Sequence, residues 1–118
     1  MNMNQIVERI HEHVLWELQQ NKENNAEPSL TIEDLVYSYA LDVVNEEMDY
    51  NNPETAPLIE SYLRPEDEAL YQQLQQLSGQ LSYDQYSTYY RIRDGALQEL
   101  GEAAGKIVLA KGVAGGVP

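Results

Sequence analysis

The sequence predicts an all-α fold, a compact bundle of about five helices in a single domain. Two observations lead to this prediction. Apolar residues recur at spacings of three and four in successive stretches, and residues that favour helix ends stand between those stretches. No stretch of useful length alternates between apolar and polar side chains, as a half-buried strand would. The chain has 118 residues and no cysteine, and a chain of this length can bury a core without disulfides or metal.

Two amphipathic helices are predicted in the first half of the chain. The first spans residues 3 to 22, and Asn2 or Asn4 is placed to cap it. The second begins at Thr31, which suits an N-cap, and runs to about Met48. Their apolar faces consist of Met3, Ile6, Val7, Ile10, Val14 and Leu18 in the first helix and of Ile32, Leu35, Val36, Tyr39, Ala40, Val43 and Val44 in the second.

Prolines and a glycine delimit the next two helices. Pro53 ends the second helix, because proline cannot continue a helix, and a short helix follows over residues 54 to 63. Pro65 suits the first turn of the fourth helix, which Gly79 ends. The apolar stripe of the fourth helix consists of Leu70, Leu74 and Leu77.

The last helix opens at a capping box formed by Ser82 and Gln85 and is predicted to continue to Ala110. Its predicted apolar residues are Tyr83, Tyr86, Tyr90, Leu97 and Leu100. Glycine inside a helix costs about 1 kcal/mol relative to alanine, so either close packing or a break is expected at Gly95, Gly101 and Gly105. We therefore expect an acidic helical domain over residues 1 to 111 and a flexible C-terminal tail over residues 112 to 118.

The negative charge is concentrated in the middle of the chain. The net charge is −13, and residues 23 to 68 contain 13 acids and a single base, Arg64. Such a chain is repelled by nucleic acid and by anionic membranes, so its expected partner is a basic protein surface. Acidity that serves only solubility is the alternative, but it does not require this segregation.

Three carboxylates of the second helix share one face, because Asp42, Glu46 and Asp49 are spaced by four and three. They are separated by about 5 to 6 Å along the axis, and successive phosphates of a nucleic-acid strand rise by about 3.4 Å per step. A row of carboxylates can therefore imitate a row of phosphates. The acidic candidates for partner binding are Glu33, Asp34, Asp42, Glu46, Glu47, Asp49, Glu54 and Glu60.

A second candidate surface lies over residues 83 to 93, which contain four tyrosines and two arginines. Tyrosine and arginine are favoured anchors of protein interfaces, and Tyr86 and Tyr89 are the candidates for partner contact. The alternative places Tyr83, Tyr86 and Tyr90 in the core and leaves Tyr89 exposed.

No catalytic site, metal site or cofactor is predicted. The sequence contains no recognisable nucleophile turn and no glycine-rich phosphate loop. Glu8 and His11 have the spacing of half a di-iron motif, but a second half is missing. A metal-binding oxidoreductase is therefore a third possibility that depends on this pair alone.

In size, acidity and helicity the chain resembles small acidic proteins that phages make against host defence, namely antirestriction DNA mimics of the Ocr type and anti-CRISPR proteins. The stretch from His13 through Glu33-Asp34-Leu35 to Ala40 and Asp42 looks like a helix–loop–helix of such proteins. The neutral second half differs from the Ocr type, whose C-terminal helix is acidic.

The resemblance implies a non-enzymatic inhibitor that occupies the basic nucleic-acid-binding surface of a CRISPR effector or a restriction enzyme. It would act in the cytoplasm of an infected bacterial host; no secretion signal and no membrane-spanning run is recognised in the sequence. The alternative is a helical homo-oligomeric structural or assembly protein. In that case the tyrosines and the small residues Gly101, Ala104 and Gly105 would pair copies, for example as a homodimer.

Overall fold

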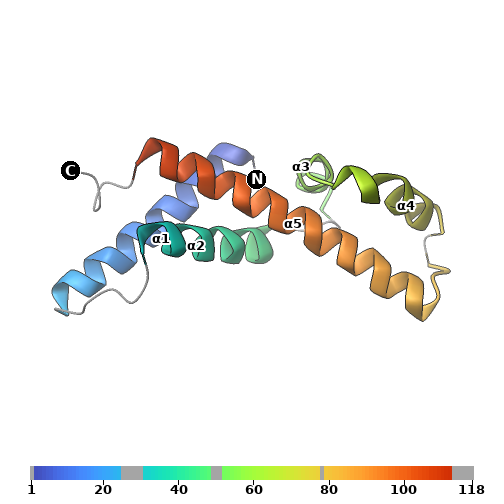
Figure 1. The fold of residues 1–118 in the computed structure, drawn as a ribbon, viewed down its shortest axis with the longest axis horizontal. Coiled ribbons are helices and arrows are strands. Elements are labelled where there is room, and N and C mark those ends of the chain that lie inside the picture. Colours follow the sequence, from blue (N-terminus) through green and yellow to red (C-terminus); the bar gives the residue numbers. More distant parts are fainter. Residues whose placement is uncertain (1, 25–30, 49–51, 78, 113–118) are drawn as a thin grey trace.

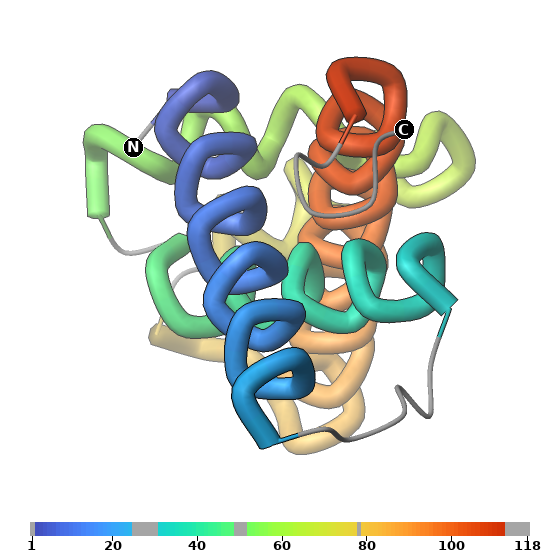
Figure 2. Tube along the Cα trace, turned by 90° about the vertical axis from the view of Figure 1, so that its left-hand side faces the viewer, coloured from blue at the N-terminus to red at the C-terminus, as the bar shows by residue number. Residues whose placement is uncertain are grey.

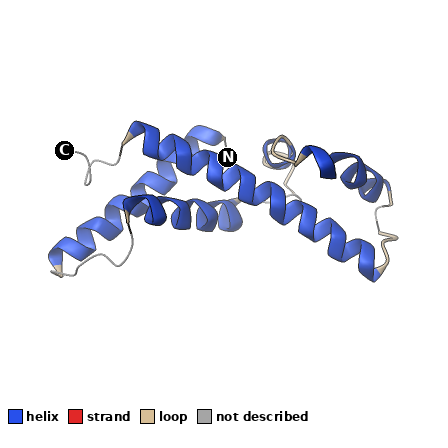
Figure 3. Ribbon diagram, in the orientation of Figure 1, coloured by secondary structure: helices blue, strands red, loops and turns tan. Residues whose placement is uncertain are grey.

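The computed structural model describes residues 2–24, 31–48, 52–77 and 79–112, and all regular secondary structure in these ranges is α-helical (Figures 1 and 3). The helices are α1 (Met3–Glu23), α2 (Ile32–Glu47), α3 (Ala56–Glu60), α4 (Pro65–Gln76) and α5 (Tyr83–Lys111). The predicted all-α class with five helices is confirmed. Two parts of the sequence-based prediction, Asp49 and the tail beyond residue 112, lie outside the described residues.

Side-chain caps fix the starts of the three longest helices where the sequence predicts them. Asn2 and Gln5 exchange two hydrogen bonds of 2.9 Å at the start of α1. Ser82 and Gln85 form the same capping box at the start of α5, with bonds of 2.8 and 3.2 Å. The Thr31 hydroxyl accepts one bond at the start of α2. Each cap satisfies backbone N–H groups that have no partner within the helix.

The short helix α3 is smaller than the predicted segment 54–63. Thr55 precedes it and Pro57 lies in its first turn, and turns continue beyond Glu60 to Tyr62. The hydroxyl of Ser61 donates a 2.6 Å hydrogen bond to the carbonyl of Leu58. Such local bonds compete with regular helix, which explains the early end.

The main core lies where α2 runs across α1 and the C-terminal half of α5 (Figure 2). Most of the predicted apolar residues of α1 and α2 are buried there. The core consists of Ile6, Val7, Ile10, Val14, Leu35, Val36, Ala40, Val43, Val44, Met48, Ile59, Ala96, Leu100, Ala104 and Val108. Within the described ranges, no helix combines the length and the hydropathy that crossing a bilayer would require.

Helix α5 runs unbroken through its three glycines because two of them lie against α2. A Cβ atom on Gly101 would lie 2.9 Å from Leu41 Cδ2, and one on Gly105 would lie 2.7 Å from Tyr37 Cδ1. Both distances are too short for a Cβ atom unless the Leu41 and Tyr37 side chains, or α2 itself, move away. These glycines therefore allow α2 and α5 to approach closely, which is the first of the two outcomes that the sequence left open.

The protein is more extended than the predicted compact bundle. Its radius of gyration is 16.9 Å, whereas about 13.5 Å is typical of a compact domain of this length. The cause is visible in Figure 1: α4 and the N-terminal half of α5 form a hairpin that projects from the main core. A second, smaller cluster holds this hairpin together and consists of the buried residues Tyr71, Leu74 and Ile92.

The prediction for the apolar face of α5 is wrong at its tyrosines. Tyr83, Tyr86 and Tyr90 are 85%, 41% and 54% exposed. The reason is that α4 covers only one side of this part of α5, and that side carries Tyr89 and Ile92. The stripe predicted for α4 is only partly correct, since Leu74 is buried while Leu70 and Leu77 are exposed.

Candidate partner-binding surfaces

Two exposed carboxylates one turn apart form the centre of the acidic surface. Asp42 and Glu46 lie on the solvent side of α2, between residues that enter the core. Four residues of helix separate them by about 6 Å along the axis. The helix holds this spacing rigidly, because both of its flanks are packed against α1 and α5. We call Asp42 and Glu46 the acidic pair.

Helix α1 adds a carboxylate to this surface that the sequence analysis missed. The carboxylate of Glu17 in α1 lies near Tyr39 of α2, and the Tyr39 ring stacks on His13 at 5.4 Å between centroids. Burial raises the pKa of Tyr39 above its ordinary value of 10.0, and the negative charges of Glu17 and Asp42 raise this pKa further. The negative surface therefore extends from the acidic pair onto α1.

This arrangement predicts a loss of stability at high pH. A raised folded-state pKa means that the folded protein prefers the protonated phenol more than the unfolded chain does. Tyr39 therefore contributes stability that is fully present below pH 10.0, the ordinary pKa, and is lost as the pH rises through its folded pKa. The variant Tyr39→Phe should lose less stability than the wild type between neutral pH and pH values above 10.0. Urea unfolding at both pH values measures the difference, and equal losses in the two proteins would contradict the assignment.

Glu47 has a structural role and does not add an exposed carboxylate to the predicted set. Its Oε1 atom lies 2.7 Å from Arg9 Nη1 of α1, and its side chain is 23% exposed. The other oxygen, Oε2, is buried without a hydrogen-bond partner in the structure. Glu47 therefore ties α2 to α1.

The remaining acidic candidates are exposed but dispersed. Glu33 and Asp34 lie in the first turn of α2, where they stabilise the positive end of the helix, about 12 Å along the axis from the acidic pair. Glu54 precedes α3, and Glu60 ends it with Oε1 3.5 Å from the Tyr71 hydroxyl. The carboxylates predicted as one set are thus spread over several parts of the surface.

The single base of the acidic segment does not neutralise α2. Arg64 pairs instead with Glu99 of α5, with Nε 3.2 Å from Oε1. The charge of Asp67, in the same segment, is compensated by a base outside the segment. Nη2 of Arg91 in α5 lies 3.6 Å from Oδ1 of Asp67. The acidic pair takes part in none of the ion pairs that the described residues form.

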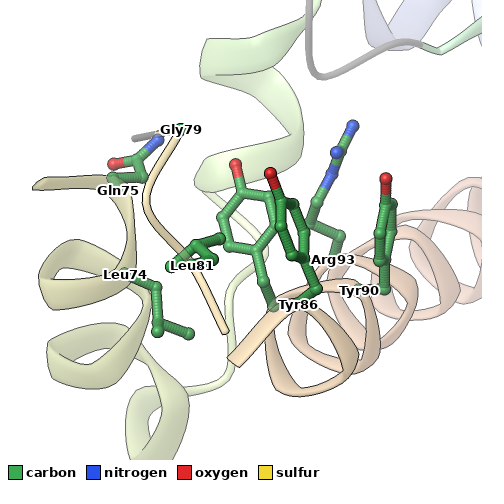
Figure 4. A pocket seen from close by; sticks show the side chains of 8 residues that line it. Leu74, Gln75, Gly79, Leu81, Tyr86, Tyr90 and Arg93 are labelled. Carbon is green, nitrogen blue, oxygen red and sulfur yellow. The ribbon is translucent and has the colours of Figure 1, made fainter. Parts of the chain in front are cut away.

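The second surface is aromatic and lies at the far end of the α4–α5 hairpin. Figure 4 shows Tyr86 and Tyr90 side by side, and their rings stack at 6.4 Å with an angle of 24°. Arg93 lies over the Tyr90 ring at 5.7 Å. A cavity of about 350 Å³ opens beside them and is lined by Leu74, Gln75, Gly79, Leu81, Tyr86, Tyr89, Tyr90 and Arg93.

The two tyrosines predicted as contact residues differ in their surroundings. Tyr86 is exposed. Tyr89 is partly buried, and its ring stacks on Tyr71 of α4 at 5.5 Å with an angle of 2°. The structure therefore reverses the alternative that placed Tyr86 in the core and Tyr89 in solvent. Tyr89 supports the hairpin, and Tyr86 with its exposed neighbours forms the surface.

Two further features of the sequence do not form surfaces. The small residues Gly101, Ala104 and Gly105 are buried against α2, so they cannot pair copies of the chain. Glu8 and His11 line a groove of about 240 Å³ beside Val108 and Lys111. Among the residues that the structure describes, no three histidine, aspartate or glutamate side chains gather closely enough to hold a metal ion.

The acidic pair lies on α2 and the exposed tyrosines lie on the α4–α5 hairpin, so the two surfaces belong to different parts of the molecule (Figure 1). Comparisons with protein families, with curated proteins and with solved structures found no match.

Proposed function

We propose that this chain is a non-enzymatic inhibitor whose acidic surface occupies a basic, nucleic-acid-binding surface of a host defence protein, either a CRISPR effector or a restriction enzyme. The observation that supports the proposal is the exposed acidic pair, Asp42 and Glu46, on a helix held from both sides. The resemblance to phage-made DNA mimics in size, acidity and helicity points in the same direction.

The charge distribution argues against a role in solubility alone. Residues 23 to 68 carry 12 of the 13 net negative charges, and the base within this segment is bound to Glu99. Like charges four residues apart on a helix destabilise it slightly. Solubility would be served equally well by carboxylates spread over all helices, without this repulsion.

A rigid row of carboxylates suits a groove that binds phosphates. Asp42 and Glu46 are fixed at a separation of about 6 Å along the axis, and Glu17 of α1 broadens the row near Tyr39. Arginine and lysine side chains that bind phosphates bind carboxylates by the same charge-assisted hydrogen bonds. Long-range attraction between the two surfaces would also speed their encounter.

The direct test is an assay of DNA binding by purified CRISPR effector complexes and restriction enzymes. The chain is expected to displace DNA from one of them, and the displacement should weaken as salt rises, because salt screens exposed charges. If DNA binding by every member of the panel is unaffected at low salt, the proposal fails.

The alternative, a homo-oligomeric structural or assembly protein, loses part of its support. Its small-residue patch is used inside the molecule, between α5 and α2. The exposed tyrosines remain available for contact, and they are compatible with either function.

A further inference from the structure

The α4–α5 hairpin has a small core of its own and an exposed aromatic face. Among the described residues, Tyr71, Leu74 and Ile92 are the buried members of its cluster. Helices in proteins owe most of their stability to the packing of an apolar face. In α5, the face toward α4 is packed, whereas the adjacent face of the same helix is uncovered. That uncovered face carries Tyr83, Tyr86 and Tyr90, which are among the most exposed large apolar residues of the described chain.

The uncovered face has a pattern that can pair with itself. Tyr83, Tyr86, Tyr90 and Arg93 follow one another at spacings of three, four and three, so they share one side of α5. We call these four residues the tyrosine stripe. The sequence of spacings reads the same in both directions. An antiparallel copy of the helix therefore presents side chains at matching heights, as a two-fold interface requires.

The charge distribution favours the tyrosine stripe over the acidic pair for contact between copies. The hairpin over residues 65 to 93 contains four acids and two bases, a net charge of −2, and one of the acids, Asp67, is paired with Arg91. The stripe itself carries a single charge, that of Arg93. Two copies that approach through the acidic pair bring like charges together and repel each other, whereas two antiparallel copies that approach through the stripe place each Arg93 against a tyrosine.

We propose that a second copy of this chain covers the tyrosine stripe, with the two α5 helices antiparallel about a two-fold axis at the level of Thr88. Tyr86 then lies opposite the partner's Tyr90, and Tyr83 lies opposite the partner's Arg93. The inner pairs are aromatic contacts, and the outer pairs place a guanidinium over a tyrosine ring. Arg93 already lies over the rings of Tyr89 and Tyr90 in the single chain, so its head group is positioned on this face.

The chemistry of the stripe favours the antiparallel arrangement over the parallel one. In a parallel pair, each residue meets its own counterpart, and Arg93 would face the partner's Arg93 at a cost in like-charge repulsion. The cavity beside the stripe is lined by residues of α4, of α5 and of the connection between them, among them Gln75 and Leu81, and it can receive side chains of the partner. Two hairpins joined in this way form a four-helix bundle.

The exposed area fits a dimer of moderate affinity. The three tyrosines together expose about 350 Å² per copy, if a whole tyrosine offers on the order of 200 Å². Stable interfaces bury about 800 Å² per partner. The tyrosines thus supply nearly half of that area, and the other residues that line the cavity beside them must supply the rest. Such an interface predicts a dimer that dissociates on dilution.

This inference is independent of the proposed inhibitor function, and its test requires no target protein. Light scattering across a micromolar concentration series should show the mass rise from 13.4 kDa toward twice that value. Two double variants, Tyr86→Lys/Tyr90→Lys and Tyr86→Glu/Tyr90→Glu, should each stay monomeric, because like charges then meet across the two-fold axis. An equimolar mixture of the two variants should form a heterodimer. Circular dichroism controls for the fold of each variant.

Cross-linking tests the register, because the chain has no cysteine of its own. A mixture of Tyr86→Cys and Tyr90→Cys should form a disulfide-linked heterodimer on mild oxidation. Tyr90→Cys alone should link poorly, since two such residues are offset by about 6 Å along antiparallel helices. A wild type that stays monomeric over the whole series would overturn the proposal. So would double variants that dimerise like the wild type, a mixture that stays monomeric, or efficient linking of Tyr90→Cys alone, which indicates the parallel register.

Discussion

The variant Gly105→Leu is expected to lower the free energy of unfolding by about 2 kcal/mol, because overpacking a tight interface typically costs about 1–3 kcal/mol. A Cβ atom at this position would lie 2.7 and 2.8 Å from two ring atoms of Tyr37. Either the Tyr37 ring has to leave its packed position or α2 has to move away from α5 to admit the new side chain. The loss is expected even though leucine favours helix more than glycine does. Urea unfolding followed by circular dichroism measures it.

Gly95 provides the matched control within the same helix. A Cβ atom there would meet its nearest neighbour, Arg64 Cζ, at 3.5 Å, which is an ordinary contact. The variant Gly95→Ala should therefore raise the free energy of unfolding by about 0.5–1 kcal/mol, the usual helix preference for alanine over glycine. Equal effects of the two variants would show that close approach of α2 and α5 does not explain the glycines.

Reversal of the acidic pair is expected to have the largest effect on function. The double variant Asp42→Lys/Glu46→Lys should slow association with the basic target by about tenfold at low salt, because long-range charge mainly steers the encounter. Its fold should be unchanged, since both side chains are exposed. Stopped-flow or surface-binding kinetics measure the association rate, and circular dichroism checks the fold.

Two carboxylates of α1 give a control with the same change in charge. Glu8 and Glu12 are exposed and, like the acidic pair, four residues apart. The variant Glu8→Lys/Glu12→Lys should alter the association rate much less. Glu17 is unsuitable for this control, although its position in α1 places it outside the acidic segment, because its negative charge acts together with that of Asp42 on Tyr39. If both double variants slow association equally, only net charge matters, and the acidic pair is not the contact surface.

The helices were largely predictable from local chemistry. Ser82 with Gln85, Asn2 and Thr31 are caps whose bonds involve residues a few positions apart, and all three form as expected. The end of α3 was less predictable, because Ser61 is compatible both with a longer helix and with a local turn. In the turn, its hydroxyl donates a hydrogen bond to the carbonyl of Leu58. The caps at the helix starts were therefore predicted correctly, whereas the equally local bond from Ser61 to Leu58 at the end of α3 was not.

Which face of a helix is buried was not predictable where the neighbour was unknown. The tyrosines of α5 fit an apolar stripe, yet α4 packs against the adjacent side and takes Tyr89. Tyr71 is 2% exposed and forms the centre of the hairpin cluster, although it stands outside the leucine stripe predicted for α4. Periodicity identifies candidate faces, and only the packing of α4 on α5 decides between them.

The candidate site likewise combines features that the sequence alone predicts with features that depend on how the helices pack. The segregation of charge and the spacing of Asp42 and Glu46 are properties of the sequence itself. The loss of Glu47 to an internal pair with Arg9 and the gain of Glu17 depend on how α1 packs on α2. No local signal distinguishes these two glutamates from their exposed neighbours.

The salt dependence of the association rate tests the central claim most directly. For the wild type and its target, the rate should fall steeply as salt rises, because screening shortens the reach of exposed charges. The fall should be shallower for Asp42→Lys/Glu46→Lys than for the wild type. For Glu8→Lys/Glu12→Lys, the fall should be nearly as steep as for the wild type. A wild-type rate that does not respond to salt would contradict the account, because the acidic surface would then play no part in finding the target.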